Sequence, residues 1–113
     1  MQVEIRSKDF PITPGIRSYT ERRLGFALDR FAGRIQRAQV YMGDVNGPKG
    51  GRDKLCRIVV SVASATAVVE EARPDLYRAI DRAASRAARK IAREVGRANR
   101  PAPPRFFIYQ GVA

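Results

Sequence analysis

The residues best placed to do chemistry in this chain are arginines that recur at helical spacing near its C-terminal end. Six of them follow one another at intervals of three or four residues: Arg78, Arg82, Arg86, Arg89, Arg93 and Arg97. At 100° per residue they fall within an arc of roughly 100°, which Lys90 borders. Guanidinium groups held in this way can pair with several phosphates, because each presents a planar fork of donors.

This arginine row differs from an ordinary solvated helix face because it carries almost a single sign of charge. Each like-charge pair four residues apart weakens an isolated helix by about 0.2–0.5 kcal/mol. Asp81 and Glu94, by the same projection, point elsewhere. We therefore interpret the row as a face that binds a polyanion. We expect Arg86, Arg89 and Arg93 to be largely free in the isolated protein and to supply affinity without stabilising the fold.

The helix that carries the row must rest its opposite side on the rest of the protein. Asp75 can accept hydrogen bonds from the free amide groups of the first turn. Apolar residues then recur at three- and four-residue spacing: Leu76, Ile80, Ala83, Ala84, Ala87, Ile91 and Val95. Alanine is the commonest of these, which suits close packing on a sheet. A membrane-surface helix would carry Phe, Trp or Leu there, so we expect no membrane partner.

The rest of the chain alternates between the periodicities of strands and helices. The expected elements, in order, are a strand at 2–6, a helix at 14–32, strands at 35–42, 54–63 and 66–71, and the arginine helix. The fold class is therefore α+β, with the order β-α-β-β-β-α. Both helices must bury their apolar stripes on one face of a four-stranded sheet, side by side, as in double-stranded-RNA-binding domains.

The first helix contributes further cations to the same surface. Thr13 and Pro14 are its expected N-cap and first residue, and Gly33 is its expected stop. Its inner face is predicted to comprise Ile16, Thr20, Leu24, Ala27, Leu28 and Phe31. Arg22, Arg23 and Arg30 then stand on or beside the outer face, which continues into the arginine row.

Composition agrees with a nucleic-acid partner. The 113 residues carry 22 basic and 11 acidic side chains, a net charge of +11, and fit one domain. We place this domain at residues 1–97, followed by an extended Pro-rich tail at 98–113. In that tail Phe106, Phe107, Ile108 and Tyr109 can dock on the domain, add to a strand edge or stack on bases.

The sequence shows no constellation of residues that would support catalysis. It contains no histidine, and its one cysteine, Cys56, alternates with inward-facing strand residues, so we expect it to be buried. The Gly-rich loop at 43–53 lacks the spacing of a P-loop or an EF-hand. We expect no enzyme, no cofactor, no metal and no small-molecule substrate. The single cysteine and the lack of a signal peptide or a long apolar run indicate a cytoplasmic protein.

The second helix opens with a motif that resembles the short ribosome hibernation promoting factors, the ribosome-associated inhibitor Y-protein (sigma-54 modulation protein) family. Residues 75–81 read Asp-Leu-Tyr-Arg-Ala-Ile-Asp, similar to the family's D-x-Y-x-A-I-D. Basic residues follow at Arg86, Arg89 and Arg93, and Ile12-Thr13 with Arg17 and Arg23 resembles the family's first helix. The likeness covers about residues 1–97. The 46–51 loop is longer than in the short factors, and the tail matches no form of the family.

The resemblance implies binding to rRNA of the small ribosomal subunit, in the channel that holds mRNA and tRNA, and inhibition of translation in stressed or resting cells. Off the ribosome we expect a monomer. Two alternatives remain open from the sequence: a stand-alone protein that binds structured or double-stranded RNA, and an interaction protein whose arginines pair with an acidic protein partner.

Overall fold

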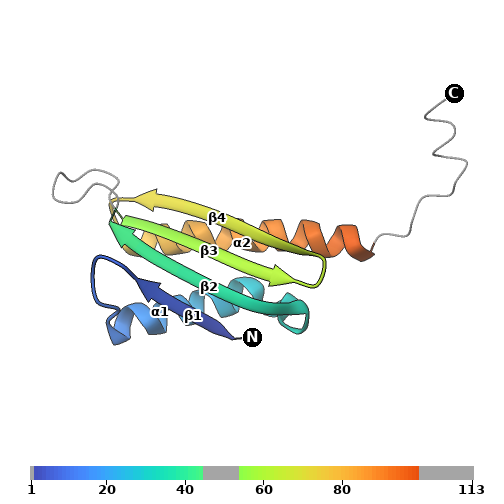
Figure 1. Ribbon diagram of the computed structural model, residues 1–113, viewed down its shortest axis with the longest axis horizontal. Coiled ribbons are helices and arrows are strands. Elements are labelled where there is room, and N and C mark those ends of the chain that lie inside the picture. Colours follow the sequence, from blue (N-terminus) through green and yellow to red (C-terminus); the bar gives the residue numbers. More distant parts are fainter. Residues whose placement is uncertain (1, 45–53, 100–113) are drawn as a thin grey trace, which may run out of the picture.

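The computed structural model describes residues 2–44 and 54–99. In chain order the elements are β1 (Val3–Ser7), α1 (Pro14–Leu28), the 3-10 helix η1 (Asp29–Arg34), β2 (Ile35–Asp44), β3 (Lys54–Val62), β4 (Ala65–Arg73) and α2 (Leu76–Asn99) (Figure 1). The expected order β-α-β-β-β-α and the α+β class are confirmed.

The four strands form one mixed sheet in the order β1-β2-β3-β4. β2 pairs antiparallel with β3, and β3 pairs antiparallel with β4. β1 instead pairs parallel with β2, because α1 carries the chain back across the sheet between them. Each strand presents alternate residues to the two faces of the sheet, and residues paired on neighbouring strands point to the same face. The row Ile5, Val40, Ile58 and Val69 lies on the buried face.

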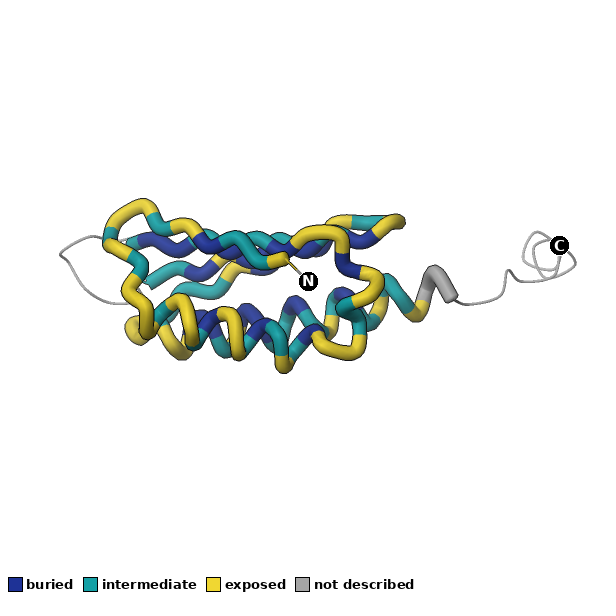
Figure 2. Tube along the Cα trace, turned by 90° about the horizontal axis from the view of Figure 1, so that it is seen from below, coloured by how far each residue is buried: buried dark blue, intermediate teal, exposed yellow. Residues whose placement is uncertain are grey.

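Both helices cover this same face of the sheet, as predicted (Figure 2). α2 packs on β3 and β4 through residues that are at most 1% exposed: Ala79, Ile80, Ala83, Ala84, Ala87 and Ile91. α1 buries Thr20, Leu24 and Leu28 and lies beside α2. The alanines let the α2 backbone approach the sheet closely, so that long side chains at the helix flank can reach the nearest strand.

The ends of the first helix show one agreement and one difference. Thr13 caps the helix as predicted, because its Oγ1 accepts a hydrogen bond from the Ile16 amide at 3.1 Å. The α-helix ends at Leu28, however, and residues 29–34 continue as 3-10 turns that contain Gly33. A single helix to residue 32 with a stop at Gly33 was therefore wrong in detail. Tighter turns are common where a helix ends, and here they keep Phe31 against the core.

Two strands are longer than the sequence pattern predicted. β2 continues through Gly43 and Asp44, where the Asp44 amide donates to Asp9 Oδ2 at 2.6 Å and Asp44 Oδ2 pairs with Lys54 Nζ at 3.2 Å. β4 runs on to Arg73, two residues past the predicted end. The predicted loop at 43–53 therefore loses its first two residues to β2. Its remainder, residues 45–53, and the tail from residue 100 onwards lie outside the described residues.

Cys56 lies on the buried face of β3 and is fully buried, as predicted. Burial away from water, with the Glu71 charge nearby, raises the pKa of its thiol to about 12. A thiol in this state is protonated at neutral pH and is a poor nucleophile.

Among the described residues, no helix is long and apolar enough to cross a membrane.

Candidate nucleic-acid interface

The interface is built on α2, whose start is fixed by Asp75. The Asp75 carboxylate accepts a hydrogen bond from the Tyr77 amide at 3.0 Å, and its carbonyl accepts one from the Ala79 amide at 3.1 Å. This cap satisfies donors that the first helical turn would otherwise leave free. From the first turn onwards, the alanine and isoleucine stripe of α2 faces the sheet.

Four arginines of the predicted row project from α2 into solvent: Arg78, Arg82, Arg89 and Arg93. Within the part of the chain that the structure describes, none of their guanidinium groups has a hydrogen-bond or ion-pair partner. We call these four the exposed row. Their charges repel one another along the helix, and no acidic side chain here neutralises them. The exposed row is thus a rigid line of available phosphate donors, as the sequence predicted.

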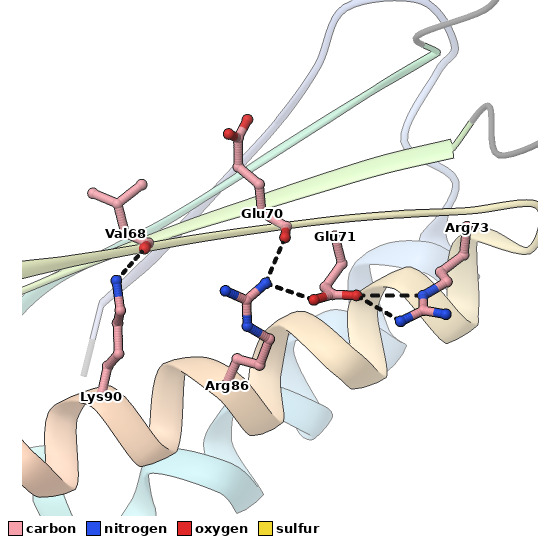
Figure 3. A network of polar contacts seen from close by, with 6 residues as sticks. All are labelled: Val68, Glu70, Glu71, Arg73, Arg86 and Lys90. Atoms are coloured by element: carbon pink, nitrogen blue, oxygen red, sulfur yellow. Dashed lines mark hydrogen bonds and ion pairs between the residues drawn. The ribbon is translucent and has the colours of Figure 1, made fainter.

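Arg86 and Lys90 behave differently from the exposed row, although they belong to the same helix (Figure 3). Arg86 Nη1 donates to the Glu70 carbonyl at 2.8 Å and contacts Glu71 Oε2 at 2.6 Å. Lys90 Nζ donates to the Val68 carbonyl at 3.0 Å. The expectation that Arg86 is largely free was therefore wrong. Both residues flank the side of α2 that lies over β4, within reach of its outer edge.

Glu71 is the mostly buried centre of the contacts around Arg86. Its side chain is only 13% exposed and is held between Arg86 and Arg73, whose Nη2 lies 2.9 Å from Glu71 Oε1. Burial alone would raise the pKa of the Glu71 carboxyl. The hydrogen bonds from Arg86 and Arg73 more than offset this effect, so the pKa lies below its ordinary value. Glu71 is therefore ionised at neutral pH and ties α2 to the end of β4.

Arg23 of α1 likewise takes part in a structural contact rather than standing on the outer face. Its Nε pairs with Asp81 Oδ1 at 3.2 Å and its Nη2 donates to Ser85 Oγ at 2.9 Å. The Tyr19 hydroxyl donates to the same Asp81 oxygen, and this bond raises the pKa of Tyr19. The Tyr19 ring also meets Tyr77 edge-on, with 4.8 Å between ring centroids. These contacts join α1 to α2, so the two helices present one fixed surface.

The remaining predicted cations lie at the margins of this surface. Arg22 and Arg30 are exposed on α1 and η1, and the Arg30 guanidinium stacks on the Phe31 ring, 4.7 Å from its centroid. The side chain of Arg97 lies outside the described part of the chain.

Sequence reasoning missed two features here: the tie between Arg86 and Glu71, and Phe26, an α1 residue that is 85% exposed. A large apolar residue on the outward side of a helical pattern is a signal that could have found Phe26.

The sequence from residue 3 to residue 99 matches the family described as Sigma 54 modulation protein / S30EA ribosomal protein. The chain belongs to this family. The match confirms the resemblance seen in the second helix. The family consists of ribosome-associated factors of the hibernation class that are not enzymes, so the chain is such a factor and the expected absence of enzymatic activity is confirmed.

Solved structures give the same fold as the family match. The crystal structure of the Thermus thermophilus Protein Y N-terminal domain is 31% identical in sequence, with a TM-score of 0.70, and the match covers 82% of this chain and 98% of that one. A ribosomal subunit interface protein from Coxiella burnetii matches with a TM-score of 0.71 at 16% identity, over 85% of this chain and 99% of that one. The second likeness supports the fold alone. No curated protein matches the chain.

Proposed function

We propose that this protein binds rRNA of the small ribosomal subunit through the outer faces of α1 and α2, blocks the channel for mRNA and tRNA, and so inhibits translation. The observation that carries the proposal is the exposed row: four guanidinium groups on one rigid helix, without partners among the described residues. Folded rRNA offers phosphates at fixed positions, which a rigid line of arginines can match without reading base edges.

The arrangement also explains why the protein carries a row that opposes its own stability. Like charges four residues apart are mildly unfavourable in the free protein, but phosphates between them convert the repulsion into attraction. Counterions released from the rRNA add a favourable term that depends on salt. We further propose that the free protein is a monomer in the cytoplasm and that residues 1–97 form the binding domain.

The proposal is tested by sedimentation with purified ribosomal subunits. The protein should comigrate with small subunits and not with large subunits, and it should inhibit cell-free translation at matching concentrations. Treating the subunits with ribonuclease before sedimentation distinguishes an rRNA partner from an acidic protein partner. If the partner is rRNA, binding should be lost. Comigration with neither subunit, or inhibition without comigration, would contradict the proposal.

A competition experiment separates ribosome binding from the alternative of a stand-alone double-stranded-RNA-binding protein. A generic RNA duplex at equal phosphate concentration should displace the protein from small subunits poorly. Equal competition by the duplex would favour the alternative, because it would show that A-form RNA alone is enough to occupy the basic surface.

A chain that ends at Asn99 should bind as tightly as the full chain if the binding domain is placed correctly.

A further inference from the structure

The most exposed large apolar side chain in the described part of the protein lies in a groove between the two helices. Phe26 is 85% exposed, whereas the other exposed large apolar side chains, Tyr77 and Val68, are 42% and 37% exposed. Tyr77 is also packed against Tyr19. A single exposed apolar residue is ordinary on a protein surface, so its exposure alone assigns no role. Its surroundings do.

The groove has a volume of about 500 Å³ and is lined from both helices. The side formed by α1 and η1 comprises Arg23, Phe26 and Ala27 of α1 and Arg30 of η1, which form one stripe toward α2. Ser85, Ala88 and Arg89 line the other side, and Asp29 completes the rim. Small side chains therefore form part of the lining, while an aromatic ring and arginines stand around it.

The three arginines of the groove differ in what they are free to do. Arg23 is held by Asp81 and Ser85, so it forms part of the wall. Arg30 is held in place by stacking on Phe31, which leaves its hydrogen-bond donors available. Arg89 belongs to the exposed row and has no partner among the described residues. Asp29 repels a phosphate at the rim, so a bound strand is favoured when it turns a base, rather than its backbone, toward this point.

We propose that Phe26 is a stacking platform for one unstacked base of the bound rRNA, with Arg30 and Arg89 on the phosphates that flank it. This inference rests on the proposed function and adds a second kind of contact to it. An aromatic face accepts any base, and the contribution of stacking does not depend on salt in the way that phosphate contacts do. The surface would then combine an electrostatic row with one aromatic anchor.

Substitutions at Phe26 separate stacking from a simple apolar contact. Affinity for purified small subunits is measured for Phe26→Ala, Phe26→Leu and Phe26→Tyr, with Val68→Ala on β4 as an exposed apolar control. Phe26→Ala and Phe26→Leu should each bind about tenfold more weakly, while Phe26→Tyr and the control stay within about twofold of wild type. The slope of log K against log salt should be unchanged in all four. Phe26→Leu binding as tightly as wild type, or Phe26→Ala within twofold of it, would overturn the inference.

A spectroscopic measurement gives an independent test, because the chain contains no tryptophan. Phe26→Trp therefore places the only indole at the proposed platform. Its emission should be quenched on addition of naked small-subunit rRNA, and unchanged emission at saturation would count against stacking. Arg82→Glu/Arg89→Glu/Arg93→Glu, titrated in parallel, tests the proposed function itself. If that variant loses affinity while the Phe26 variants do not, the proposed function stands and this inference fails.

Discussion

The two flanks of α2 carry the same kind of residue in different circumstances. On the outer flank, Arg82 and Arg89 project into solvent without partners among the described residues. On the flank that faces β4, Arg86 and Lys90 are bound to the strand (Figure 3). All four belong to one run of basic residues on the same helix, so the difference arises from what lies beside the helix. A basic side chain becomes available to a partner only where the fold leaves it no acceptor.

The cations on the β4 flank have a function within the fold. Within residues 2–44 and 54–99, β4 is an edge strand, and no further strand there pairs with its outward carbonyls at Val68 and Glu70. Arg86 and Lys90 donate to these carbonyls and place positive charge along the edge. Exposed strand edges invite pairing with other chains, and charged side chains discourage it. The β4 flank thus stabilises and protects the domain, whereas the exposed row is available for binding.

The largest effect is expected from reversing charge on the exposed row. Arg82→Glu/Arg89→Glu/Arg93→Glu should abolish inhibition of cell-free translation at concentrations where the wild type inhibits fully. Each reversal removes a phosphate contact and adds repulsion, while the fold loses no partner. The melting midpoint, measured in the same buffer, should hold or rise slightly because like-charge crowding is relieved. A folded variant that still inhibits would show that the row does not face the ribosome.

A smaller effect, on stability, is expected from the β4 flank. Arg86→Ala removes two hydrogen bonds and leaves Glu71 held by Arg73 alone. The free energy of unfolding should fall by about 1–2 kcal/mol, since Glu71 is mostly buried. Urea titration measures this change, and Arg82→Ala is the matched control, expected within about 0.5 kcal/mol of wild type. If Arg86→Ala and Arg82→Ala lower the free energy of unfolding equally, the two flanks do not differ in their contribution to stability.

Acid should reveal the Glu71 contacts through the pH dependence of stability. The pKa of Glu71 in the folded protein lies below its ordinary value of 4.5, so the ionised carboxylate stabilises the fold above that value. This contribution is lost as the pH falls through the lowered pKa. The stability difference between wild type and Glu71→Gln, about 1 kcal/mol at pH 7, should therefore shrink in acid. Glu70→Gln, whose side chain is exposed on the same strand, is the matched control at pH 7 and should stay within about 0.5 kcal/mol of wild type.

The smallest effect is expected from removing one member of the exposed row. Arg78→Ala should leave the free energy of unfolding within about 0.5 kcal/mol of wild type, because its exposed side chain has no partner among the described residues. Affinity for small subunits should fall only severalfold, since one phosphate contact is lost from several. Differential scanning calorimetry and subunit binding check both values. A marked loss of stability would place Arg78 with the structural cations.

Much of the fold could be predicted because local signals agreed with one another. Alternation identified the strands, Thr13 and Asp75 marked helix starts, and the Ala-rich stripe of α2 fixed its buried side. The tie of Arg86 could not be predicted in this way. It depends on how closely α2 lies over β4 and on the strand reaching Arg73, and neither is set by residues within the helix. Phe26 was overlooked because the periodicity was used to find inner residues and outer arginines only.

In our proposal the exposed row binds rRNA while the β4 flank holds the fold. Its most direct test is the salt dependence of small-subunit binding for two variants that each remove two charges, Arg89→Gln/Arg93→Gln and Arg86→Gln/Lys90→Gln. The first should make the slope of log K against log salt shallower by about 1.5 to 2 with an unchanged melting midpoint. The second should change the slope by less than half as much and lower the midpoint. Equal slopes for the two variants, or a larger change for the second, would contradict the account.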